Sequence, residues 1–244
     1  MPISRKLTAK EVALVICFTA LYSVFASIPI FQILGLPSRS ITAAAITAPI
    51  IGIVLGPYIG VLSVVLGGII SFYAGAFLPS FVSGIVATLC AGLLYKGKRI
   101  LCVLVYFLFL VIFGFYPSIG PAWLFPLSMW FQVAGLLILI SPFQSMAIRD
   151  IRSRNNSRFF LAFFIISLTS TLAGQISGSL AYVLVVSVPV GGWLALWQSY
   201  TIVYPIERII IALSSTLAGV PLLRVLQSAN LIHMINRGHQ ERPS

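Results

Sequence analysis

Charged side chains are scarce in this sequence. Only 4 of its 244 residues are acidic and 8% are charged, whereas soluble domains carry about 25% charged residues. Hydrophobic residues make up 59% of the chain and the mean hydropathy is +1.08, which excludes a soluble globular domain. Several apolar runs reach the ~20 residues that a helix needs to cross the hydrocarbon core of a bilayer. The composition therefore predicts a polytopic α-helical membrane protein.

The residue types that build catalytic and metal sites are also few. Cys17, Cys90 and Cys102 stand alone in apolar stretches without metal-ligand spacing, and His233 and His239 fall in a basic C-terminal tail. The sequence has no HExxH, no paired intramembrane aspartates, no Gly-x-Ser-x-Gly and no nucleotide-binding loop. We therefore expect no enzymatic activity, no metal site and no cofactor.

Apolar segments follow one another along the whole chain. They predict an all-α bundle of about eight spans in a single transmembrane domain, residues 1–244. The first segment lacks a small-residue cleavage site, so we expect it to be retained. The second and third are separated by Gly56-Pro57, because proline disfavours helical geometry in the residue before it. The predicted spans are residues 9–31, 42–56, 58–77, 79–95, 99–117, 121–142, 158–186 and 200–226.

The net charge of +11 comes from short basic clusters between these spans, not from a surface suited to nucleic acid. If the N-terminus is cytoplasmic, thirteen of the fifteen basic residues fall on the cytoplasmic side, and only Arg39 and Arg208 do not. The positive-inside rule then places both termini in the cytoplasm. Residues 227–244 would form a basic cytoplasmic tail.

Small residues recur at helical spacing in two spans and predict close helix packing. The first stripe begins at the cytoplasmic edge, where a partner can reach it. It consists of Ala9, Ala13, Cys17 and Ala20, and the second consists of Gly60, Ser63, Gly67, Ser71 and Ala74.

Glu207 and Arg208 stand side by side in the last apolar span. Apart from Glu11 at the very start of the first span, Glu207 is the only acidic residue within the predicted spans. A charged group at mid-membrane costs about 2.5–3.5 kcal/mol on insertion scales, so such groups usually face a cavity or a partner. Adjacent residues of a helix point about 100° apart, so at least one of the two needs a partner from elsewhere. Two interpretations stay open, a ligand contact in an outward-facing cavity and a local ion pair.

A polar stripe on the preceding span lies at a comparable depth. Thr171, Gln175, Ser179 and Tyr182 fall at i, i+4, i+8 and i+11 and share one helical face. Such a stripe can join helices by hydrogen bonds, but together with an ionisable pair it favours a polar cavity. Aromatic residues at the outer ends of other spans are expected to wall this cavity, namely Tyr73, Phe77 and Phe81. We expect the segment from Val186 to Tyr200, with Trp193 and Trp197, to be a loop along the outer interface.

Several stretches resemble the membrane-embedded substrate-binding subunits (S components) of energy-coupling factor (ECF) transporters, which take up vitamins in bacteria and archaea. One is the start "SRKLTAKEVALVICFTALYSVFA", in which Ala9 and Ala13 match the family's Ala-x-x-x-Ala pattern. Another is "ITAAAITAPIIGIVLGPYIGVLSVVLGGIISF", and the third is the closing "YPIERIIIALSSTLAGVPLLRVL". The family usually has six spans, so residues 99–142 look like an inserted helical hairpin.

This resemblance implies a binding subunit in the prokaryotic cell membrane that captures a vitamin-like molecule from outside. The ligand would lie under the loop between the first two spans, with Arg39, and beside Glu207, Arg208, Gln175, Ser179, Tyr182 and Tyr73. A separate transmembrane coupling protein with two ATPase subunits would dock on Ala9, Ala13, Cys17 and Ala20. Two other classes stay open, a structural or assembly membrane protein and a self-sufficient permease.

Overall fold

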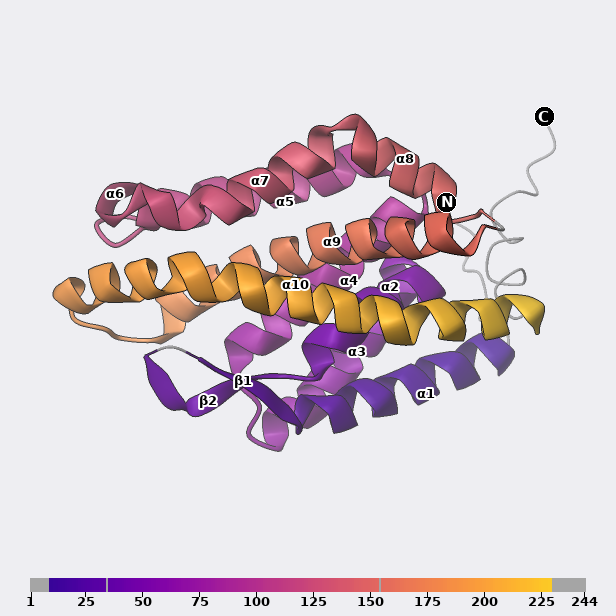
Figure 1. Ribbon diagram of the computed structural model, residues 1–244. Coiled ribbons are helices and arrows are strands. Elements are labelled where there is room, and N and C mark those ends of the chain that lie inside the picture. Colours follow the sequence, from indigo (N-terminus) through magenta and orange to yellow (C-terminus); the bar gives the residue numbers. More distant parts are fainter. Residues whose placement is uncertain (1–8, 34, 154, 230–244) are drawn as a thin grey trace, which may run out of the picture.

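The computed structural model describes residues 9–33, 35–153 and 155–229. In these ranges the chain forms a bundle of helices with one two-stranded β-hairpin (Figure 1). The start of α1 and the end of α10 lie at one end of the bundle, and the hairpin lies in the other half. Most of the predicted basic tail, from residue 230 onward, and the basic residues Arg5, Lys6 and Arg154 lie outside the described residues.

Each of the eight predicted spans contains a helix. The helices are α1 (Ala9–Ala26), α2 (Ala44–Leu55), α3 (Pro57–Tyr73), α4 (Leu78–Tyr95), α5 (Arg99–Gly114), α6 (Pro121–Leu124), the 3-10 helix η1 (Pro126–Met129), α7 (Trp130–Ile140), α8 (Pro142–Asp150), α9 (Asn156–Val185) and α10 (Val190–Ser228).

Three described helices are long and apolar enough to cross a membrane, Leu78–Tyr95, Asn156–Val185 and Gly191–Ser228. The pair Pro126–Ile140 and Pro142–Asp150 is long and apolar enough only when taken together, and it bends by 63°, as a broken span or a re-entrant loop does. The helices in the remaining predicted spans are shorter: α2 has 12 residues and is therefore roughly 18 Å long at 1.5 Å per residue. The long apolar helices are compatible with a membrane location.

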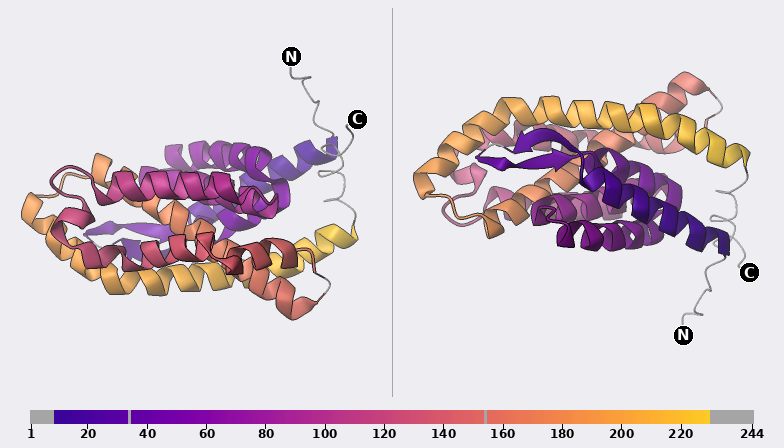
Figure 2. Two further views of the ribbon diagram at one scale, coloured as in Figure 1. Left: turned by 90° about the horizontal axis from the view of Figure 1, so that it is seen from above. Right: turned by 90° about the horizontal axis from the view of Figure 1, so that it is seen from below.

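The first predicted span is too long at its C-terminal end, and the expectation of an all-helical fold is wrong there. α1 ends at Ala26, and the chain continues as β1 (Pro29–Ile33) and β2 (Leu36–Thr42), which pair antiparallel. Proline at the start and isoleucine and phenylalanine after it favour an extended strand over a further helical turn. Seen from below, the hairpin runs alongside the first half of α10 (Figure 2, right).

Glycines let the helices of the first half approach one another closely, as the sequence predicts. Gly56 has a φ of +80°, which ends helix α2, and Pro57 is the first residue of α3. A Cβ at Gly52 of α2 would collide with the backbone oxygen of Thr88 in α4, whose hydroxyl donates to the carbonyl of Ala48 at 2.9 Å. The bundle therefore depends on backbone contact between α2 and α4.

The helices α5, α6, α7 and α8 form a layer of their own above α9 and α10, which we call the α5–α8 layer (Figure 1). Viewed from above, α5 runs beside α7 and α8 (Figure 2, left). The hydroxyl of Tyr106 in α5 donates to the carbonyl of Gln132 in α7 at 2.7 Å, deep in the interface. Residues 99–142 thus contain two helices, α5 and α7, that pack against each other, and α8 extends this layer. That the segment is an insertion stays a prediction.

The loop expected between Val186 and Tyr200 is wrong for most of its length, because α10 begins at Val190. Trp193 and Trp197 are 2% and 1% exposed, so they pack inside the protein instead of lying at its outer edge. Their indole nitrogens donate to the backbone oxygens of Val188 and Ile119 at 3.1 and 2.9 Å.

Candidate functional site

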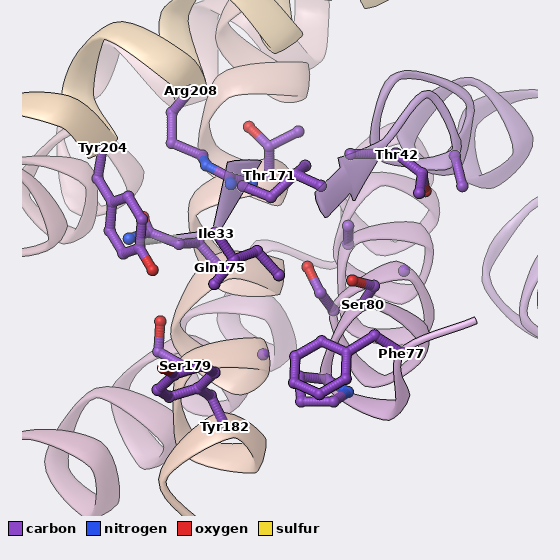
Figure 3. Close-up of a pocket in the computed structure, with 18 of the residues that line it drawn as sticks. Ile33, Thr42, Phe77, Ser80, Thr171, Gln175, Ser179, Tyr182, Tyr204 and Arg208 are labelled. Atoms are coloured by element: carbon purple, nitrogen blue, oxygen red, sulfur yellow. The ribbon is translucent and has the colours of Figure 1, made fainter. Parts of the chain in front are cut away.

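A partly open cavity lies between α4, α9, α10, the start of α2 and the β-hairpin (Figure 3). The space open to the centre of a water molecule is about 70 Å³. A single water needs about 10–15 Å³ by this measure, so the cavity has room for a few water molecules or one small chemical group. The hairpin and the first half of α10, which line it, lie away from the start of α1 and the end of α10.

One wall of the cavity is polar and comes from α9. All four members of the predicted polar stripe line it, namely Thr171, Gln175, Ser179 and Tyr182. α9 can lie this close to α4 because a Cβ at Gly174 would be 2.6 Å from the backbone oxygen of Ser83. The small residue keeps the two backbones in contact and thereby sets the width of the cavity.

A second wall is aromatic and follows one face of α10. The rings of Trp193 and Trp197 stack with centroids 5.4 Å apart, and those of Tyr200 and Tyr204 stack at 4.1 Å. Trp197, Tyr200 and Tyr204 line the cavity, and Arg208 follows one turn further along. The wall thus offers flat apolar faces with a charged group at one end.

Arg208 is 4% exposed and lines the cavity, whereas Glu207 is 5% exposed and does not. Figure 3 shows the side chain of Arg208 reaching from α10 toward Thr171. One guanidinium nitrogen, Nη2, lies 3.9 Å from Oε2 of Glu207, so the neighbours form a loose ion pair despite their separation around the helix. Neither Glu207 Oε2 nor Arg208 Nε has a hydrogen-bond partner, which leaves a buried donor at the cavity.

Gln175 brings a buried acceptor to the same cavity. The amide of Gln132 in α7 is oriented so that its nitrogen donates to the carbonyls of Ser128 and Met129 at 3.0 and 3.2 Å, and its oxygen then accepts from Gln175 Nε2 at 3.3 Å. This contact fixes the nitrogen side of the Gln175 amide. Its oxygen, Oε1, is buried without a hydrogen-bond partner. An unsatisfied buried acceptor is costly, so a ligand or water has a reason to bind here.

A second pocket opens outside the first, between the hairpin and the turn from α3 to α4. Its volume is about 290 Å³ by the same measure, and Thr42 and Phe77 line both spaces. Arg39 lines only the outer pocket: its Nη1 donates to the carbonyl of Gly75 at 2.9 Å and its guanidinium carbon lies 5.6 Å from the centroid of Phe77. Phe77 therefore stands between the two spaces.

Four residues predicted to form the cavity do not line it, and one of them, Arg39, lines the outer pocket instead. Tyr73 is 87% exposed at the end of α3, and Glu207 is buried beside Arg208 without lining the cavity. Phe81 does not line the cavity either, because it packs against Gly68 of α3. The stripe of Ala9, Ala13, Cys17 and Ala20 is exposed along α1, whose opposite face packs on α3 through Val15, Phe18 and Tyr22.

The aromatic wall of α10 was not predicted from the sequence. Trp193, Trp197, Tyr200, Tyr204 and Arg208 are spaced by four, three, four and four residues, which is the signature of one helical face. Extending the last span back to Val190 would have revealed the pattern. The contribution of Ile33 and Ile41 from the hairpin has no comparable signal, because it depends on how the hairpin folds over the bundle.

Comparison with known proteins adds no relative: no protein-family model, no curated protein and no solved structure matches the chain. Among the described residues, no group of three or more histidine, cysteine, aspartate or glutamate side chains could hold a metal ion. The chemistry of the site therefore has to be argued from its own donors, acceptors and rings.

Proposed function

We propose that the chain is a membrane-embedded solute-binding subunit for uptake, similar to the S components of ECF vitamin transporters. The observation that carries the proposal is the cavity between α4, α9 and α10, to which Arg208 and Gln175 bring buried polar atoms beside stacked aromatic rings. Ligand sites are typically concave and mostly apolar, with a few fixed polar groups.

The proposal includes a topology of eight spans with both termini in the cytoplasm. The cavity then opens toward the outside of the cell, because the hairpin and the first half of α10, which line it, lie away from the start of α1 and the end of α10. A solute would enter through the outer pocket, past Arg39 and Phe77. Since the inner cavity is narrow, a vitamin-sized solute requires Phe77 and the hairpin to move outward.

The proposal also assigns a separate source of energy. A transmembrane coupling protein with two ATPase subunits would dock on the exposed stripe of α1, namely Ala9, Ala13, Cys17 and Ala20. Small side chains permit the close helix approach that replaces the hydrophobic effect as a driving force within lipid. A self-sufficient permease would instead move the solute without ATP.

A ligand screen on purified protein tests the binding function. Riboflavin, thiamine, biotin and cobinamide are added singly, and the thermal unfolding of wild type is compared with that of Gln175→Leu. We expect one of these compounds to raise the unfolding temperature of wild type, since ligand bound only to the folded state stabilises it. Tyr73→Ala is the matched control, because Tyr73 lies off the cavity, and should respond as wild type does.

A compound that stabilises all three proteins equally would contradict the site. If none of the four has any effect while Gln175→Leu lowers the unfolding temperature by itself, the polar groups serve helix packing, which is the structural alternative.

A further inference from the structure

We infer that the deep cavity recognises an uncharged heterocycle or carboxamide, through a carbonyl oxygen that accepts from Arg208 and an N–H that donates to Gln175. This inference rests on the proposed binding function and narrows it to a ligand class. It depends on the charge around Arg208 and on the orientation of the Gln175 amide.

The charge of the site is already balanced before a ligand enters. Glu207 approaches the guanidinium of Arg208 to 3.9 Å from the side away from the cavity, and both side chains are buried. An anionic ligand group would give this cluster a net charge of −1 in a medium where two unit charges still interact by several kcal/mol. A neutral acceptor, such as a ring carbonyl, can accept a hydrogen bond from Arg208 Nε, which has no other partner, without adding a net charge to the buried cluster.

The amide of Gln175 selects for a donor. Its nitrogen is engaged by Gln132, which is held in turn by the carbonyls of Ser128 and Met129. Gln132 takes one of the two N–H groups of this nitrogen, whereas the oxygen Oε1 is buried without any hydrogen-bond partner. This oxygen accepts a hydrogen bond and repels a carboxylate. Gln132 is a positioning residue, because it orients the amide of Gln175. Through this contact the α5–α8 layer influences which ligand the cavity binds.

The aromatic wall completes the description of the ligand. The stacked pair Tyr200 and Tyr204 lines the cavity, and aromatic side chains favour a flat partner in an offset-stacked or edge-to-face arrangement. The limited space, about 70 Å³ for the centre of a water molecule, suits one ring at this depth. Any larger substituent of the ligand would extend toward the outer pocket, past Thr42 and Phe77.

Two pairs of probes that differ mainly in charge test the inference: nicotinamide against nicotinate, and uracil against orotate. Their dissociation constants are measured from the fluorescence of Trp197 and Trp193 in the detergent-purified protein. We expect wild type to bind the neutral member of at least one pair at least about tenfold more tightly than its anion.

Removing the balancing acid should change this preference. In Glu207→Gln the cavity contacts remain but the cluster gains a positive charge, so the ratio of affinities should shift at least about tenfold toward the anion. The double variant Glu207→Gln/Arg208→Gln is again neutral, so it should bind the neutral probe more weakly than wild type does and gain no affinity for the anion. If Glu207→Gln fails to fold, the affinities of wild type and the double variant for the neutral and anionic probes still test the inference.

The outcomes separate the inference from the proposed function. Tighter binding of nicotinate or orotate by wild type would overturn the neutral ligand class and leave a binding subunit. Absence of binding for all four probes would also overturn it, and the proposed function would then stand or fall on whether the protein carries a solute of its own. An unchanged preference in Glu207→Gln would contradict the role of the balancing acid.

Discussion

The indole nitrogen of Trp130 donates to the backbone oxygen of Thr201 at 3.0 Å. This oxygen lacks its usual partner in the helix, because the residue four positions later is Pro205, which has no N–H. The α5–α8 layer thus supplies a hydrogen-bond donor, Trp130, to a carbonyl that Pro205 leaves without a partner in the first half of α10. The contact lies at the aromatic wall, because Thr201 directly follows Tyr200 on α10.

Trp130→Phe should lower the free energy of unfolding by about 1 kcal/mol, the usual net contribution of one hydrogen bond. Equilibrium unfolding in mixed detergent micelles measures the loss. In a Pro205→Ala background the helix can supply its own donor to Thr201, so the same substitution should then cost much less. Equal losses in both backgrounds would show that Trp130 acts only through packing.

Glu207→Gln should destabilise the protein by about 3–5 kcal/mol, because it leaves the buried guanidinium of Arg208 without a counter-charge. The double variant Glu207→Gln/Arg208→Gln should recover most of that loss. With the single variant Arg208→Gln added, thermal and denaturant unfolding of the four proteins completes a double-mutant cycle. Additive losses would mean that the two groups do not interact and that Arg208 has another partner.

Gly52→Ala should cost more than about 2 kcal/mol or prevent folding, since its new methyl group would collide with the backbone of Thr88. Gly191→Ala is the matched control, because a Cβ there meets nothing within 4 Å. It should change stability by no more than about 0.5 kcal/mol. A mild effect at Gly52 would contradict the close packing of α2 on α4.

Phe77→Ala should speed both the entry and the release of solute by about tenfold or more, because Phe77 stands between the outer pocket and the inner cavity. The affinity should change less than either rate, since the deep contacts of Arg208 and Gln175 are untouched. Stopped-flow tryptophan fluorescence with a bound probe measures the rates. Phe72→Ala is the control, because Phe72 is half exposed on α3; a similar acceleration there would remove Phe77 from the entry path.

Local signals predicted much of the fold. Apolar runs predicted helices in all eight segments, and Gly56-Pro57 predicted the break between α2 and α3, because these signals depend on a few neighbouring residues. The hairpin was missed because its apolar residues continue the hydropathy of α1. Pro29 is the local signal that separates the two, since proline disfavours a further helical turn, whereas the alternation of exposed and half-buried positions in β1 is visible only in the folded chain.

The cavity could be predicted only where its residues share one helix. The stripe from Thr171 to Tyr182 follows from helical spacing, and the structure places it on the cavity. Tyr73 was misplaced because its orientation depends on where α3 ends and how far its last turn rotates. Arg208 lines the cavity and Glu207 does not. This difference depends on the rotation of α10 about its axis, which is determined by its packing against α9 and the α5–α8 layer.

Native mass spectrometry of the detergent-extracted protein tests most directly whether the cavity holds a solute. Wild type should carry one small molecule per chain, and Ser179→Phe, which fills the cavity from the polar wall, should carry none while remaining folded. A wild-type protein without any bound molecule, or a molecule retained equally by Ser179→Phe, would contradict a solute site between α9 and α10.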